Sequence, residues 1–119
     1  MSKRTLPPRA VIVTRPSELE LLVQRHGTRA QARFYLETRG QKLEALDATD
    51  QVLRLARHEV LAAIPAEWRR VLVSRAELDR FLFEPEDVVL AVGQDGLVAN
   101  VARYVGGQPV IGVNPSRRL

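Results

Sequence analysis

Four short runs of apolar residues, rich in Val and Ile, constrain the fold of this sequence more than any other feature. Each run is continuous rather than alternating, which is typical of strands buried on both faces of a sheet. Helical patterns fill the segments between them, and strands that alternate with helices favour a parallel sheet reached by right-handed crossovers. The expected strands span residues 9–14, 70–73, 87–92 and 109–113.

Sequences typical of helix starts occur at three places between the expected strands. Residues 17–20 and 74–77 match the capping box, in which a Ser hydroxyl and a Glu carboxylate each satisfy an unpaired backbone N–H. Residues 28–31 offer a further capping sequence for a helix that continues towards residue 40. The longest helical pattern covers residues 47–64 and is stopped by Pro65.

Together these patterns predict an α/β fold, a Rossmann-like or flavodoxin-like three-layer sandwich with a mainly parallel four-stranded sheet. The length of 119 residues suits one domain, which we expect to be compact throughout. We expect a flexible N-terminus over residues 1–8, the α/β domain over residues 9–115 and a tail over residues 116–119.

Composition narrows the classes of function. The chain has no Cys, so disulfides and Cys-based zinc sites are excluded. No apolar stretch is long enough for a membrane span or a signal peptide, which predicts a cytoplasmic protein without a membrane partner. The net charge of +4 suits an anionic small ligand. Basic residues occur at most in pairs and aromatic residues are few, so nucleic acid is an unlikely partner.

The expected ligand site lies just after the strands, because parallel sheets bind ligands beyond their carboxyl ends. The most informative sequence there is Gly93-Gln94-Asp95-Gly96, which follows a buried strand and precedes a helix. Gly93 and Gly96 remove side-chain bulk and permit positive φ, and the N–H groups at a helix start suit a phosphate. Asp95 places one carboxylate between the two glycines.

Residues 87–96, followed by a helix and by Gln108-Pro109-Val110-Ile111-Gly112-Val113-Asn114, resemble the N-terminal α/β domain of the NAD kinase family. That family shares the signature strand, Gly-Gly-Asp-Gly, helix with diacylglycerol kinases and phosphofructokinases. In NAD kinases the signature is followed by a strand ending in a phrase that residues 109–114 match. The resemblance extends over roughly residues 9–115.

This resemblance implies an ATP-dependent phosphotransferase that acts on a hydroxyl of NAD or of a sugar-like acceptor, with Mg²⁺ entering together with ATP. Asp95 corresponds to the signature Asp, which contacts the ribose of the acceptor and is proposed to take the proton of the reacting hydroxyl. Gly93 and Gly96 would form the phosphate-facing turn, Gln94 a nucleotide-binding position that tunes the choice of substrate, and Asn114 a second wall of the cleft. Phosphoryl transfer needs positioning and charge neutralisation more than covalent help, so one carboxylate is chemically sufficient.

The sequence departs from the family at three points. Gln94 stands where the signature has its second Gly, and Leu97 where the family commonly has Thr. The chain also ends where the family's second, β-rich domain would begin, so it resembles one half of a kinase. An apolar edge left by such a missing domain would favour a homo-oligomer.

Other interpretations remain open. A non-catalytic nucleotide-binding or regulatory module would keep the fold without turnover, and Asp95 would serve equally as a helix N-cap. Arg25, Arg29 and Arg33 would form an anion-binding stripe only on a continuous helix, which Gly27 interrupts; a solvated charged face is the simpler interpretation. No pair of His and acidic residues has the spacing of metal ligands, so no metal site is predicted.

Overall fold

The computed structural model describes residues 7–93 and 96–115 and contains four strands, four α-helices and one 3₁₀ helix. The element that precedes the last strand is the shortest α-helix, with six residues. The elements are β1 (Arg9–Thr14), α1 (Glu18–His26), α2 (Arg29–Glu37), α3 (Glu44–Ala63), β2 (Arg69–Ser74), the 3₁₀ helix η1 (Arg75–Glu77), β3 (Val88–Val92), α4 (Leu97–Ala102) and β4 (Val110–Val113).

The four strands form one parallel sheet in the order β2-β1-β3-β4, which confirms the predicted α/β class and sheet. The strand ends are level, since Thr14 pairs with Ser74 on one side and with Val92 on the other, and Val92 pairs with Val113. This order matches the first four strands of a flavodoxin-like sheet. In such a sheet β2 is added on one side of β1 and the later strands on the other, so the strand order reverses between β1 and β3.

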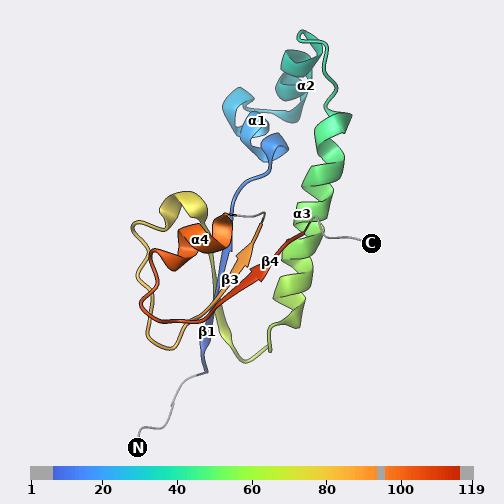
Figure 1. Ribbon diagram of the computed structural model, residues 1–119. Coiled ribbons are helices and arrows are strands. Elements are labelled where there is room, and N and C mark those ends of the chain that lie inside the picture. The colour runs from blue at the N-terminus through green and yellow to red at the C-terminus, as the bar shows by residue number, and fades with distance from the viewer. Residues whose placement is uncertain (1–6, 94–95, 116–119) are drawn as a thin grey trace, which may run out of the picture.

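Alternate side chains of the central strands enter two separate cores, one on each face of the sheet. Ala10 and Ile12 pack with Leu53 and Ala56 of α3 on one face. On the other face Val11 and Val13 belong to a cluster that α4 and the segment after η1 complete. Figure 1 shows α3 on one side of the sheet and α4 on the other, as a three-layer sandwich requires.

The helices α1 and α2 do not cover the sheet, so the expectation of a compact domain throughout is wrong. They project beyond the carboxyl ends of the strands and pack on the N-terminal half of α3 (Figure 1). The radius of gyration is 16.9 Å, whereas a compact domain of this length would have about 13.5 Å. The projecting part, here called the protrusion (residues 17–46), has its own buried cluster of Leu19, Ala32, Leu36 and Leu43.

The length of α3 explains the protrusion. Its 20 residues extend about 30 Å, whereas the six residues of β1 extend only about 20 Å. The N-terminal half of α3 therefore passes beyond the sheet and needs another apolar partner, which α1 and α2 supply. The helix also begins at Glu44, earlier than the predicted residue 47, and its N-cap makes no side-chain hydrogen bond.

The connection from β2 to β3 contains less helix than its capping sequence predicts. Ser74 and Glu77 do form the expected capping box, but it opens a single 3₁₀ turn rather than an α-helix. In the described part of the chain, no helix is both long and apolar enough to cross a membrane.

Candidate functional site

The candidate site lies at the carboxyl edge of the sheet, between β1 and β3, where the strand order reverses. Ligands of open parallel sheets bind in the crevice outside this point. The register brings Thr14 at the end of β1 next to the end of β3, from which the Gly93–Gly96 turn begins. The end of β3, and with it Gly93, is therefore at the position that the topology favours for a ligand.

Each of the two glycines of this turn has a structural reason to be glycine. Gly96 has a φ of +97°, a conformation that side chains disfavour. Gly93 is buried, donates its N–H to the carbonyl of Val113 at 3.0 Å, and leaves only 2.8 Å between an added Cβ and Cδ2 of Leu97. Gln94 and Asp95 lie outside the described residues.

The helix after the turn is a weaker anion site than expected. Gly96 is the N-cap of α4, and no side chain among the described residues caps this helix. The six residues of α4 make fewer than two turns, so few peptide dipoles add up at its start. Asn100 is occupied within the helix, because its side-chain amide donates to the carbonyl of Gly96 at 2.9 Å.

Asn114 follows β4 beside the Gly93 turn but faces a different cavity. It lines an apolar groove of about 620 Å³ that runs between the C-terminal half of α3 and the strands β3 and β4, where Trp68 and Ile111 also lie. The structure thus places Gly93 and Asn114 on neighbouring strand ends, whereas Asn114 and Thr14 belong to separate hollows.

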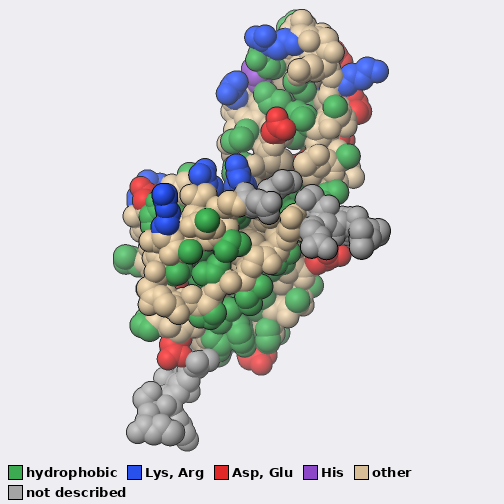
Figure 2. Space-filling model, viewed as in Figure 1, with side chains coloured by type: hydrophobic (Ala, Val, Ile, Leu, Met, Phe, Trp, Pro, Cys, Tyr) green, Lys and Arg blue, Asp and Glu red, His purple; other side chains and the backbone are tan. Residues whose placement is uncertain are grey.

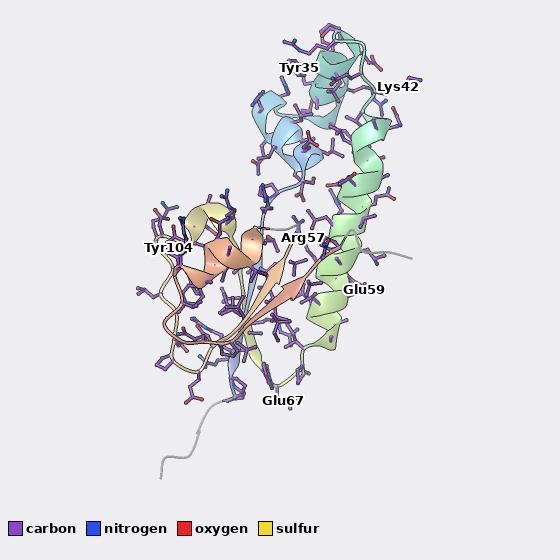
Figure 3. All side chains as sticks on the ribbon, viewed as in Figure 1. Tyr35, Lys42, Arg57, Glu59, Glu67 and Tyr104 are labelled. Atoms are coloured by element: carbon purple, nitrogen blue, oxygen red, sulfur yellow. The ribbon has the colours of Figure 1, made fainter. Side chains whose placement is uncertain are left out.

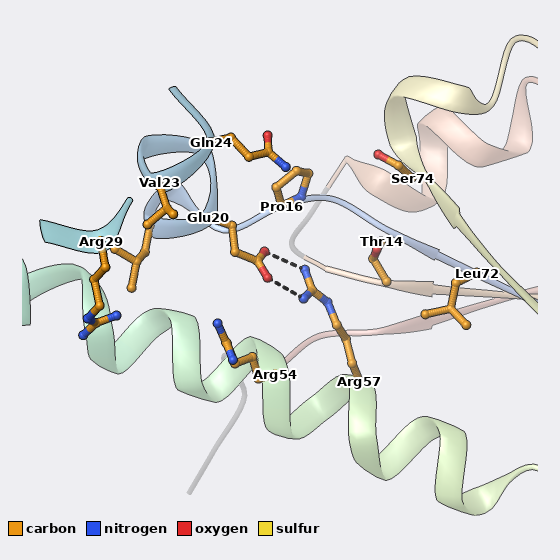
Figure 4. Close-up of a pocket in the computed structure, with 11 residues that line it drawn as sticks. Thr14, Pro16, Glu20, Val23, Gln24, Arg29, Arg54, Arg57, Leu72 and Ser74 are labelled. Atoms are coloured by element: carbon orange, nitrogen blue, oxygen red, sulfur yellow. Dashed lines mark hydrogen bonds and ion pairs between the residues drawn. The ribbon is translucent and has the colours of Figure 1, made fainter. Parts of the chain in front are cut away.

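A second, more polar pocket of about 550 Å³ opens between the protrusion, α3 and the ends of β1 and β2 (Figure 4). We call it the arginine pocket. Thr14 and Ser74 line it from the sheet, and Gln24 lines it from α1. Its remaining walls are apolar or charged side chains, namely Pro16, Leu19, Glu20, Val23, Arg29, Arg54, Arg57 and Leu72.

An ion pair with two hydrogen bonds joins the protrusion to α3 across this pocket. Both terminal amino groups of Arg57 donate to the carboxylate of Glu20, at 3.0 and 3.1 Å, and one also donates to the carbonyl of Arg15 at 2.9 Å (Figure 4). Glu20 is in addition the acceptor of the Ser17 backbone N–H, in the predicted capping box. The hydrogen bonds from Arg57 in particular lower the pKa of Glu20, against the opposing effect of burial.

A buried carboxylate holds a second arginine of the pocket. Asp50, on α3, is 3% exposed and accepts the hydroxyl proton of Ser17 at 2.6 Å and Nε–H of Arg54 at 2.8 Å. Sequence reasoning missed this group. The signal was present, because Asp50 stands three residues before Leu53 and therefore continues the apolar face of α3, where an acidic residue is unexpected.

The predicted arginine stripe is not continuous, and its two members on α2 are paired with carboxylates of α3. Gly27 interrupts the helix as predicted, with a φ of +90°. Arg29 and Arg33 then pair with Asp47 and Glu44 of α3 at 3.2 and 2.8 Å. These ion pairs fix α2 against α3.

The histidines give no sign of metal binding. His26 stacks against Tyr35, with ring centroids 4.4 Å apart. Among the described residues no three His, Asp or Glu side chains gather as metal ligands would.

No protein-family model, curated protein or solved structure matches this chain. The likeness to NAD kinases therefore rests on the residues of the signature and of the 109–114 phrase, and the fold rests on the strand order.

Cationic side chains gather along the carboxyl edge, between the protrusion and the sheet (Figure 2). Arg15 and Arg75, which directly follow β1 and β2, are both exposed, and neither side chain has a partner within the described residues. With hydroxyls at Thr14 and Ser74, the edge offers hydrogen-bond donors and positive charge, which suit a phosphorylated ligand.

Proposed function

We propose that this chain is the nucleotide-facing α/β domain of an ATP-dependent phosphotransferase similar to the NAD kinases, with NAD or a sugar-like polyol as acceptor. The observation that carries the proposal is the strand order β2-β1-β3-β4. The end of β3, which Gly93 directly follows, lies where the strand order reverses, and ligands of such folds bind there. The positive charge of the same edge supports an anionic ligand.

Each signature residue has a role in this proposal. Asp95 accepts the proton of the attacking hydroxyl or orients that hydroxyl, and Gly93, Gln94 and Gly96 face the phosphates. Asn114 follows the neighbouring strand β4 but lines the apolar groove on the α3 side of the sheet, so its role as a second wall is confined to that side. Mg²⁺ comes with ATP, because this ion is commonly held by substrate phosphates and one or two carboxylates. That mode suits a chain whose described residues contain no preformed cluster of metal ligands.

A non-catalytic nucleotide-binding module is the second candidate, and Leu97 favours it. This side chain is 1% exposed and packs in the core under Gly93, at the position where the family commonly has a Thr hydroxyl. The turn therefore lacks one polar group that could contact a phosphate, while the fold around it is intact. Binding without turnover is the expected behaviour of such a module.

Calorimetry and a transfer assay separate the two candidates. The chain is titrated with ATP, NAD and NADP, and formation of phosphorylated acceptor from ATP is followed in the presence of Mg²⁺. The kinase proposal expects turnover that falls by about 100-fold or more in Asp95→Asn, the effect of removing a general base. Asp79→Asn, at an exposed acid outside the site, is the matched control.

Unchanged turnover in Asp95→Asn removes this carboxylate from the mechanism. Ligand binding without any product supports the module. A folded protein that binds none of the three nucleotides contradicts both candidates.

A further inference from the structure

We propose that the arginine pocket binds a phosphate oxyanion, and that in the phosphotransferase this oxyanion belongs to the phosphate chain of ATP. The second part rests on the function proposed above, whereas the first stands on the pocket itself. Among the described residues, the sheet contributes Thr14, Leu72 and Ser74 to the lining of the pocket, and neither Gly93 nor Gly96 belongs to it. The pocket would place the donor nucleotide on one side of the reversal point and leave the turn for the acceptor.

The arginines of the pocket are anchored in a way that leaves donors available. Arg54 is held through Nε by the buried Asp50, and its two terminal amino groups have no partner among the described residues. Its side chain is 64% exposed. A guanidinium whose orientation is fixed by one bond and whose terminal fork is open is preorganised for a phosphate, which it can bind with two hydrogen bonds.

Arg57 contributes a donor of a different kind. Its terminal amino groups are used by Glu20 and by the carbonyl of Arg15, but its Nε–H is buried and has no acceptor within the described part of the chain. A buried donor without a partner destabilises the protein unless a ligand or water accepts from it. This donor lies beneath the pocket wall that Arg57 forms, so an oxyanion in the pocket accepts from it only if the guanidinium turns.

Neutral polar groups complete the set from the opposite walls. Thr14 and Ser74 bring hydroxyls from two adjacent strand ends, and Gln24 brings an amide from α1 (Figure 4). The Ser74 oxygen accepts the backbone N–H of Ala76 at 3.4 Å, which leaves its own proton free to donate. Donors therefore approach one space from α1, α3 and the sheet.

The charges of the pocket favour an anion over a cation. The lining contains three arginines and one glutamate. Asp47 and Asp50 offset two of these arginines, and the exposed Arg15 and Arg75 directly follow the strand ends that line the pocket. Glu20 is fully engaged by Arg57 and Ser17. No carboxylate in the lining is therefore available for a cationic ligand.

The competing explanation is that these arginines only fasten the protrusion to the sheet. Under that explanation a change to a neutral, exposed wall of the pocket would not alter anion binding. Gln24 and Leu72 provide such changes, since both are exposed and neither takes part in the ion pairs.

The experiment measures the affinity of the chain for orthophosphate, tripolyphosphate and ATP by calorimetry at low ionic strength. Gln24→Glu adds a negative charge to the pocket and should weaken tripolyphosphate binding by about tenfold or more, because the new carboxylate and the bound anion repel each other within one pocket. Leu72→Trp fills the pocket without changing any charge and should weaken it similarly. Circular dichroism establishes that each variant is folded.

Matched controls place the same changes elsewhere. Gln41→Glu lies in the exposed loop between α2 and α3, next to Lys42 at the outer end of the protrusion (Figure 3), and Leu82→Trp replaces a side chain that is 84% exposed. Both should leave the affinities unchanged. Equal weakening in the controls would show that only net charge or bulk matters, and would overturn the proposal.

The three ligands separate this inference from the proposed function. ATP binding that is insensitive to Gln24→Glu and Leu72→Trp overturns the pocket and leaves the phosphotransferase standing. Pocket-dependent tripolyphosphate binding that ATP does not compete supports a phosphate pocket and contradicts its assignment to ATP. Absence of binding by all three ligands overturns the inference and the proposed function together.

Discussion

Replacing Asp87 by Ala should lower the free energy of unfolding by about 3 kcal/mol. The carboxylate of Asp87 is completely buried, at the amino end of β3. It accepts hydrogen bonds from Nε and Nη2 of Arg9 at 2.9 and 2.7 Å and from the backbone N–H of Glu84 at 2.8 Å. These bonds tie the start of β1 to the chain that enters β3.

The magnitude follows from what the substitution leaves behind. Removing one partner of a buried pair costs about 3–5 kcal/mol, because the other charge remains in a poor environment. Arg9 is 17% exposed and keeps the carbonyl of Leu82 at 3.1 Å and the more distant Glu84 carboxylate at 3.4 Å. The lower end of the range is therefore expected.

Urea denaturation, followed by the fluorescence of Trp68 and by circular dichroism, measures this change. With a slope of about 2 kcal/mol per molar urea, the midpoint should fall by about 1.5 M. Asp79→Ala is the control, because Asp79 is 63% exposed and its nearest charge, on Arg80, is 4.0 Å away; its effect should stay within about 0.5 kcal/mol.

A loss below about 1 kcal/mol in Asp87→Ala would refute this reasoning, since it would mean that Arg9 does not depend on the pair. The double variant Arg9→Met with Asp87→Leu gives an independent check. It removes both charges together, so it should be less destabilising than Asp87→Ala alone.

Three further outcomes are expected. The folded-state pKa of Glu20 is lowered chiefly by Arg57 from its ordinary value of 4.5, so its stabilising contribution is complete above that value and is lost as the pH falls through the folded pKa. Glu20→Gln should therefore flatten the acid side of a plot of unfolding free energy against pH, and an unchanged slope would contradict the pair. In thermal melts, Gly96→Ala should lower the free energy of unfolding by about 1–3 kcal/mol because of the positive φ of Gly96. Gly106→Ala should lower it less, because an added Cβ would have nothing near it but a side-chain oxygen 3.9 Å away. Leu43→Ala should cost about 3 kcal/mol and, by hydrogen exchange, speed exchange in α1 and α2 more than in β1 and β3; uniform acceleration would argue against a separate core in the protrusion.

The sequence predicted the sheet because its strands are buried on both faces and so read as continuous apolar runs. β1 shows this best, with four of its six residues buried. The capping boxes at Ser17 and Ser74 were likewise readable, since they depend on neighbours three residues apart. What was not readable was how far the helix after Ser74 continues, which depends on tertiary packing.

The protrusion and the arginine pocket escaped prediction for a different reason. Local periodicity shows that α1 and α2 have an apolar side, but it does not say which surface that side covers. The pair between Glu20 and Arg57 joins residues 37 positions apart. Its existence follows only from the length of α3 relative to the strands. Asp50 was the one local sign, as a polar residue on an apolar face.

The continuity of α3 has a mechanical consequence for the pocket. The floor of the pocket is formed by strand ends and its roof by α1, and both rest on the same uninterrupted helix. The distance between the strand ends and α1 is thus set by a continuous helix and not by a flexible loop. Lengthening that helix by one turn, together with the short connection over residues 15–17, would move α1 about 5 Å further from the strand ends while the sheet kept its register, so this architecture can adapt to longer anions without disturbing the strands.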